Sequence, residues 1–163
     1  MVRIATWNVN SIRSRIDRVE AWLARSDVDV LAIQETKAKD EQFPYARFRA
    51  LGYEVTHHGL SQWNGVAIAS RVGLDDVQVG FDGDPGWGEP AAAEARAIGA
   101  TCGGIRMWSV YVPNGRALED PHMAYKLRWL ARLREQASEW AADGTPVALK
   151  ILHVAASGEH IAA

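Results

Sequence analysis

The sequence predicts a single α/β domain whose strands run in both directions. Short apolar runs have the spacing of strands, two long amphipathic segments have the spacing of helices, and turn residues separate them. With 163 residues and 48% hydrophobic content, the chain is long enough for one domain, which at this size buries roughly 70% of its unfolded surface. No internal repeat or low-complexity segment is present, and the composition does not change before about residue 150.

A β-α-β unit opens the chain. Val2 to Trp7 predict a short strand, and Val28 to Ile33 predict a second strand whose apolar, branched side chains suit burial on both faces. Between them, Ser11 can cap a helix that begins at Ile12. In this helix, apolar side chains recur at helical spacing at Ile16, Val19, Trp22 and Leu23.

The middle of the chain predicts short elements joined by turns. Residues 44–51 are typical of a short helix that Gly52 ends. Strands are then predicted at 53–58, 65–70 and 77–81, and their turn-rich connections predict a meander. The segment 82–95 combines glycine, proline and acidic residues without periodicity, so we expect an exposed loop.

A hairpin, a helix and a last strand complete the predicted elements. Gly103-Gly104 is a strong signal for a two-residue turn between strands at 96–102 and 105–112. The second long helix is expected at 121–142, because glycine and proline follow it closely. Residues 147–149 predict the start of another strand.

Charge, cysteine content and the N-terminal segment narrow the function classes. The formal net charge is −2, so any contact with nucleic acid needs local basic clusters rather than bulk charge. Cys102 is the only cysteine, which excludes an internal disulfide and a cysteine-based zinc site, and its apolar surroundings suit a buried thiol. The opening "MVRIATWNVN" has no long apolar stretch. We therefore expect a cytoplasmic protein without membrane contact, and no obligate protein partner is evident.

Polar side chains follow three of the predicted strands. They are Asn8 and Asn10 after the first strand, Glu35 after the second, and Tyr111, Asn114 and Arg116 at or after the end of the hairpin. In α/β sheets, ligands bind beyond the carboxyl ends of the strands. A carboxylate with amide oxygens suits Mg²⁺, which takes one or two protein carboxylates and keeps water or phosphate in its other positions.

Each of these side chains also has a purely structural explanation. Glu35 can be an exposed acid paired with Lys37 or Lys39, and Asn8 can be a turn residue or the residue before a helix. For Tyr111, a buried aromatic with a hydrogen-bonded hydroxyl is the commoner case. The strand-end pattern by itself leaves both explanations open.

Several stretches together resemble one family. "TWNVNSIRSR", "LAIQETK", "YEVTHHG" followed by "NGVAIAS", and "YVPNGR" have the order and approximate spacing seen in exodeoxyribonuclease III. That family comprises apurinic/apyrimidinic endonucleases and 3′-to-5′ exonucleases of the endonuclease/exonuclease/phosphatase superfamily. The resemblance covers residues 1–149, and the "QETK" and "NSIR" stretches are similar to the DNA-repair branch.

The resemblance implies a role for each strand-end residue. Glu35, assisted by Asn8, would bind the catalytic Mg²⁺, with Mn²⁺ as an alternative, and Asn10 would belong to the polar network of the active site. The residues that would contact the substrate phosphate are Tyr111, through its hydroxyl, and Asn114, with Arg96 and Arg116 as weaker candidates. The implied partner is double-stranded DNA with abasic sites or 3′ ends.

The implied fold is the DNase I-like, four-layered α/β/β/α sandwich with a mixed sheet, of which this chain holds roughly half. We expect this truncated version to leave an inner sheet face without a partner. Such a face would expose an apolar patch larger than soluble monomers usually show. The chain would then be marginally stable, oligomeric or prone to aggregation.

The resemblance ends at Leu149. The family continues into a glycine-aspartate-any residue-asparagine motif whose aspartate is the leading candidate for activating the attacking water, whereas this chain reads "KILHVAASGEHIAA". The family's later metal-site aspartate and its aspartate-histidine pair have no counterpart. We therefore assign 1–149 to the N-terminal part of the domain and interpret 150–163 as a divergent tail, disordered or produced by a shifted reading frame.

Three hypotheses about function remain. The first is a DNA-repair phosphodiester hydrolase by family, with this chain expected to be inactive because half of the catalytic set is missing. The second is a non-catalytic fragment that binds metal or DNA weakly. The third is a small-molecule phosphatase of the same superfamily, which the "QETK" and "NSIR" stretches disfavour.

Overall fold

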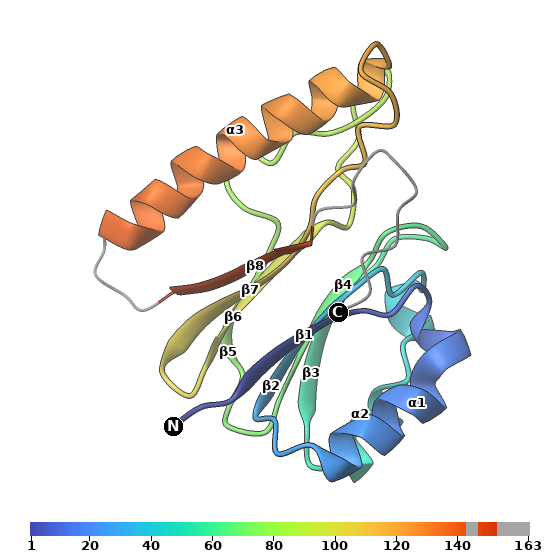
Figure 1. The fold of residues 1–163 in the computed structure, drawn as a ribbon, viewed down its shortest axis with the longest axis vertical. Helices are drawn as coiled ribbons and strands as arrows, with labels where there is room; N and C mark the ends of the chain where they lie inside the picture. The colour runs from blue at the N-terminus through green and yellow to red at the C-terminus, as the bar shows by residue number, and fades with distance from the viewer. Residues whose placement is uncertain (143–146, 153–163) are drawn as a thin grey trace.

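Two β-sheets lie face to face, each with helices on its outer side (Figure 1). The computed structural model describes residues 1–142 and 147–152. The layers follow the order helix, sheet, sheet, helix, which is the predicted α/β/β/α arrangement. Within these residues, no helix is both long and apolar enough to cross a membrane.

The first sheet has the strand order β1-β2-β4-β3. Its strands are β1 (Ile4–Asn8), β2 (Val30–Gln34), β3 (Glu54–His58) and β4 (Val66–Ser70). β1 is parallel to β2, and the other pairs are antiparallel. The outer face is covered by α1 (Ile12–Arg25), the 3-10 turn η1 (Asp40–Gln42) and α2 (Tyr45–Ala50). Their apolar side chains, including Val19, Leu23 and Phe48, pack on the strands.

The second sheet has the order β5-β6-β7-β8. Its strands are β5 (Asp75–Val79), β6 (Ala97–Cys102), β7 (Ile105–Tyr111) and β8 (Val147–Leu152). β6 and β7 form the predicted hairpin, and β8 is parallel to β7. The long helix α3 (Pro121–Ala142) covers the outer face of this sheet, with Tyr125, Trp129 and Leu133 buried against Trp108.

A third apolar cluster joins the two sheets. It consists of Val30, Val66, Ile68, Ile98, Ala100, Cys102 and Met107, all buried. The sheets also share a buried hydrogen bond, from Gln34 Nε2 to Ser109 Oγ at 3.1 Å. The expectation that an inner sheet face lacks a partner is therefore wrong, because this chain supplies strands to both sheets and each covers the other.

One predicted arrangement of strands, the meander, needs correction. β3 and β4 pair as expected, but β5 pairs with β6 in the second sheet, so the three strands do not form a meander. The reason is that β2 already occupies the other edge of β4. The strand predicted to start at residue 147 is β8, which extends to Leu152. The rest of the predicted tail, 153–163, lies outside the described residues.

The two sheets have edge strands on the same side of the sandwich. Because β2 packs opposite β7 and β3 opposite β6, the strand orders place β1 and β8 at the same edge. No residue of β1 is fully buried, and Ile4 is 42% exposed, whereas every residue of β2 is buried. β1 is therefore less completely packed than β2, as expected for an edge strand.

Candidate active site

A cavity of about 500 Å³ opens where the carboxyl ends of β2 and β7 meet the loops around them. Its lining residues are Glu35, Lys37, Trp63, Asn64, Trp87, Glu94, Arg96, Tyr111, Asn114, Arg116 and His122. Five of the seven residues singled out from the sequence line it, and the other two, Asn8 and Asn10, lie behind Glu35.

Glu35 is the central anion of this cavity. Its side chain is only 15% exposed. Asn8 Nδ2 donates to Glu35 Oε1 at 2.6 Å, Lys37 Nζ lies 3.2 Å from Oε2, and the Tyr111 hydroxyl donates to the same carboxylate. Burial would raise the pKa of Glu35, but these donors outweigh it and hold the pKa below its ordinary value. The carboxylate is therefore ionised at neutral pH.

The loops that carry the site contain unusual backbone conformations. Six of the seven non-glycine residues with positive φ lie in or beside the site: Asn10, Ser11, Glu35, Lys37, Asn64 and Arg116. Such conformations cost of order 1–3 kcal/mol each and persist only where surrounding contacts determine them. Here, Ser11 N–H donates to the Glu35 carbonyl at 2.7 Å and Lys37 N–H donates to the Asn64 carbonyl at 2.9 Å. The β1–α1, β2–η1 and β3–β4 connections thus hold one another in place.

The two asparagines predicted after β1 act on Glu35 and Lys37 rather than on the open cavity. Asn8 presents its amide nitrogen to Glu35, while its Oδ1 accepts from the Asn10 backbone N–H at 3.1 Å. Asn10 Oδ1 in turn accepts from Lys37 Nζ at 2.5 Å. In this arrangement Asn8 orients the Glu35 carboxylate, and direct metal ligation by Asn8 stays a prediction.

Tyr111 brings a protonated hydroxyl to the carboxylate. Burial, together with the negative charge of Glu35, raises the pKa of Tyr111 far above its ordinary value. The phenol is therefore a hydrogen-bond donor at neutral pH. The guanidinium of Arg96 lies over the Tyr111 ring, 5.1 Å from its centroid, and fixes the ring from the other side.

Glu94 connects three parts of the site and was not predicted from the sequence. Arg96 Nε donates to its Oε2 at 2.7 Å, the Tyr125 hydroxyl donates to the same oxygen at 3.0 Å, and Asn64 Nδ2 donates to Oε1 at 3.0 Å. Burial would raise the pKa of Glu94, but these donors hold it below its ordinary value. An ionised carboxylate thus ties β6, α3 and the β3–β4 loop together under the cavity.

Asn114 and Arg116 form the outer wall of the cavity. Asn114 Oδ1 accepts from the Arg116 backbone N–H at 2.9 Å, and the Asn114 carbonyl contacts His122 Nδ1. Both side chains are exposed. Arg116 has no ion-pair partner within residues 1–142. Both side chains lie exposed at the cavity mouth, and contact with a phosphate stays a prediction for them.

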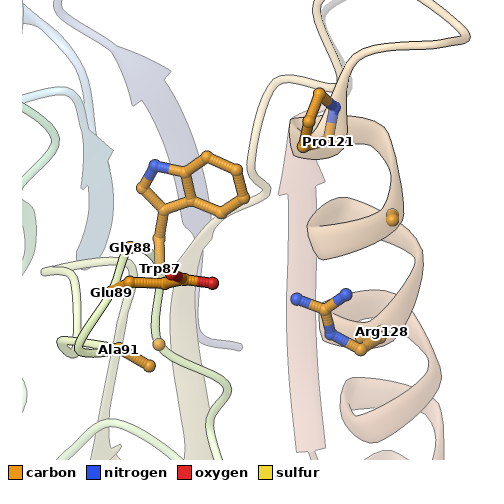
Figure 2. A pocket seen from close by; sticks show the side chains of 8 residues that line it. Trp87, Gly88, Glu89, Ala91, Pro121 and Arg128 are labelled. Carbon is orange, nitrogen blue, oxygen red and sulfur yellow. The ribbon is translucent and has the colours of Figure 1, made fainter.

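A second cavity of about 370 Å³ lies between the loop 86–91 and α3 (Figure 2). Figure 2 shows Trp87 and Glu89 on the loop side, with Pro121 and Arg128 on the helix side. Trp87 lines both cavities and packs edge-on against His122, with ring centroids 4.4 Å apart. Trp87 is therefore the wall between them.

Comparison with known proteins assigns the chain to a protein family. The sequence profile described as the endonuclease/exonuclease/phosphatase family matches residues 5–148. This chain belongs to that family. The match includes β2, β7 and every residue that lines the cavity, so the site lies within the family's shared domain.

Three nucleic-acid-processing proteins illustrate what this member of the endonuclease/exonuclease/phosphatase family is similar to. Exodeoxyribonuclease III of Haemophilus influenzae is 35% identical over 83 residues, which cover 51% of this chain and 31% of that protein. An AP endonuclease from Archaeoglobus fulgidus is 42% identical with a TM-score of 0.77, covering 85% of this chain and 52% of that one. A 3′ phosphatase from Neisseria bound to a product DNA hairpin is 36% identical with a TM-score of 0.80, covering 87% and 53%.

These matches confirm the predicted resemblance and the predicted DNase I-like fold class. This chain spans about half the length of the solved structures and less than a third of the curated relative that it matches.

The residues of this family member fit a divalent cation of the Mg²⁺ type. The described residues contain no cluster of three acidic, histidine or cysteine side chains that could hold a metal, but Mg²⁺ needs only one or two protein carboxylates. The ionised Glu35 carboxylate has about four acceptor positions, and Asn8, Lys37 and Tyr111 use three of them. Glu35 can therefore bind one cation that keeps water or phosphate in its other positions.

Proposed function

We propose that this chain provides the metal- and phosphate-binding part of a cytoplasmic DNA-repair phosphodiester hydrolase of the exodeoxyribonuclease III kind. Its substrates would be abasic sites and 3′ ends in double-stranded DNA, and its metal Mg²⁺, with Mn²⁺ as an alternative. The observation that carries the proposal is the convergence of the Glu35 carboxylate, the Tyr111 hydroxyl and the exposed donors of Asn114 and Arg116 on one cavity.

Each group has a defined task in this proposal. A bound divalent cation would stabilise charge on the phosphoryl oxygens and the leaving group. Glu35 would hold the cation, with Asn8 and Lys37 fixing the carboxylate. The Tyr111 hydroxyl would donate to a phosphate oxygen, which its raised pKa allows at neutral pH. Asn114 and Arg116 would orient the phosphate from the cavity mouth.

Binding without turnover is the second candidate, and strand β8 favours it. The register places Lys150 beside Ser109, Ile151 beside Val110 and Leu152 beside Tyr111. These are the positions at which the family resemblance predicts the water-activating aspartate, and none of the three residues is a carboxylate. Within the described residues, Glu35 and Glu94 are the only acids that line the cavity, and both already hold other groups in place.

Removing the charge of Glu35 is expected to abolish stabilisation by Mg²⁺. Titrating Mg²⁺ should raise the melting temperature of the parent chain, since a ligand at 100 times its Kd stabilises the folded state by about 2.7 kcal/mol. Glu35→Gln should show no such rise, because it keeps the shape of the side chain and loses its charge. The matched control is Glu54→Gln, at an exposed glutamate of β3, which should respond like the parent. A flat titration in the parent would exclude the proposed metal site.

Incision of duplex DNA at an abasic site separates turnover from binding. We expect no incision above background, because loss of catalytic groups costs several orders of magnitude. Binding of the same duplex in Mg²⁺ should still be measurable by fluorescence anisotropy, and Arg116→Ala should weaken it. Incision that disappears in both Tyr111→Phe and Glu35→Gln would show that the chain is catalytic. Displacement of the DNA by a sugar phosphate at low concentration would instead favour a small-molecule phosphatase.

A further inference from the structure

A buried chain of polar side chains lies directly behind Glu35. Thr36 Oγ1 is 2.8 Å from His57 Nε2, and Asp40 Oδ1 is 2.7 Å from His57 Nδ1. Thr36 and the His57 side chain are completely inaccessible to solvent. None of these three residues lines the cavity, so none of them can touch a substrate there.

The protonation of His57 defines the direction of the Thr36 hydrogen bond. Burial lowers the pKa of His57 to about 4, although the charge of Asp40 opposes the shift. A neutral imidazole carries one N–H, and the adjacent Asp40 carboxylate favours placing it on Nδ1. Nε2 is then an acceptor, and the Thr36 hydroxyl donates to it. The Nδ1 contact with Asp40 is close but is not aligned as a hydrogen bond.

Backbone contacts tie the same residues to the β3–β4 loop. Thr36 N–H donates to the Gly65 carbonyl at 3.1 Å, and Gly59 and Asp40 exchange two hydrogen bonds, at 2.8 and 3.2 Å. Gly65 packs so closely that a Cβ there would come within 2.0 Å of Thr36 Oγ1. A Cβ on Gly59 would collide with the Ala38 carbonyl and the His57 ring. Only glycine at these two positions allows the loops to approach this far.

Thr36 also lies between two strained residues. Glu35 has φ +52° and Lys37 has φ +49°, so the backbone on both sides of Thr36 adopts a left-handed conformation. These are the two residues whose side chains carry opposite charges into the cavity. An anchor on the residue between them fixes both backbone conformations together.

We propose that Thr36 and His57 are positioning residues, which hold the Glu35 carboxylate and the Lys37 ammonium in the cavity through the hydroxyl-to-imidazole hydrogen bond. Asp40 supports His57 from the η1 turn. The consequence for metal binding rests on the proposed function of Glu35, whereas the effect on the loop does not. The three residues act through the backbone of the 35–37 segment and make no contact with the substrate.

Thr36→Val tests this role, because it keeps the shape of the side chain and removes the hydroxyl. Amide hydrogen exchange at Thr36 and Lys37, whose N–H groups donate to Gly65 and Asn64, should become at least tenfold faster, while exchange in α3 stays unchanged. Thr36→Ser should restore the parent rates. The matched control is Thr101→Val on β6, which removes a threonine hydroxyl that donates to Asp76 of β5. It should leave exchange at residues 36 and 37 unaltered.

His57→Phe provides a second variant. It keeps an aromatic ring beside Phe43, whose centroid lies 4.5 Å from that of His57, and removes both nitrogens. Loop exchange should accelerate as in Thr36→Val. In both variants the Kd for Mg²⁺ should rise about three- to tenfold, measured by isothermal titration calorimetry.

The exchange rates and the Mg²⁺ affinities together support or contradict the positioning role of Thr36 and His57. Unchanged exchange at residues 36 and 37, or acceleration of equal size throughout the chain, would overturn the positioning role. Faster loop exchange with an unchanged Mg²⁺ affinity would overturn the link to the Glu35 carboxylate. A parent chain that binds no Mg²⁺ would refute the proposed metal function alone, and the exchange rates would still decide whether Thr36 and His57 position the loop.

Discussion

Replacing Trp108 with alanine is expected to cost roughly 3–5 kcal/mol of unfolding free energy. Trp108, on β7, is completely buried in the cluster between the second sheet and α3. Its ring stacks on Trp140, with centroids 4.3 Å apart and planes 19° apart, and covers Gly99 on the neighbouring strand. Alanine would leave a large cavity in this cluster. The cavity could close only if the whole of α3 moved towards the sheet.

Urea denaturation followed by circular dichroism measures this loss. Domains of this kind have unfolding free energies of about 5–15 kcal/mol, so the midpoint should fall by roughly a fifth or more, and the variant has a measurable unfolded fraction if the parent is at the low end. The matched control is Trp63→Ala, at a tryptophan that is 65% exposed, with an expected change below about 0.5 kcal/mol. Equal effects of the two variants would contradict the packing of α3 on the second sheet.

Replacing Arg96 with methionine is expected to destabilise the fold by about 3 kcal/mol at neutral pH, because it leaves a carboxylate without its charge partner in a poorly solvated site. The Arg96 side chain is only 5% exposed, and it holds Glu94 at 2.7 Å. The Tyr125 and Asn64 donors remain and limit the loss. Adding Glu94→Gln should recover more than half of it, as expected for coupled residues.

The contribution of Glu94 to the free energy of unfolding depends on pH. The pKa of Glu94 lies below its ordinary value of 4.5, so Glu94 contributes stability above that pH, and the contribution is lost as pH falls through the lowered pKa. Without Arg96, burial dominates and the pKa rises. The difference between parent and Arg96→Met should therefore be largest near pH 7 and shrink as pH falls, first through the raised pKa of Glu94 in the variant and then towards its lowered pKa in the parent. Arg71→Met, at a solvent-exposed pair with Asp27, should show a much smaller effect; an equal loss would contradict the argument from burial.

Local signals predicted most of the elements. Helical spacing gave α1 and α3, and Gly103-Gly104 gave the hairpin of β6 and β7. The sheet to which β5 belongs could not be predicted in this way, because it depends on which edge of β4 is already paired. The same limit explains the wrong expectation of an uncovered sheet face, since the apolar cluster that contains Ile68 and Ile98 joins segments without a common local pattern.

The site was predictable where a residue follows a strand. Glu35 and Tyr111 were found because each stands at the carboxyl end of a buried strand. Their mutual hydrogen bond was not, since β2 and β7 belong to different sheets. Glu94 and Trp87 lie in a loop without periodicity, and the position of Glu94 two residues before Arg96 was the one available hint. Thr36 and His57 function through loop conformations that no residue pattern reveals.

Strand β8 lies at the edge that it shares with β1, and its alignment with β7 determines which residues stand beside Tyr111. A parallel ladder fixes which residue of β8 pairs with Tyr111, and in this structure that residue is Leu152. Because successive side chains of a strand point to opposite faces, a slip of β8 by one residue would exchange every group presented on that face. The identity of the residue beside Tyr111 is therefore decided jointly by the sequence of β8 and by the hydrogen bonds that align it with β7. A residue with a carboxylate, introduced into β8, would pair with Tyr111 only if the alignment of residues 106 and 147 were preserved.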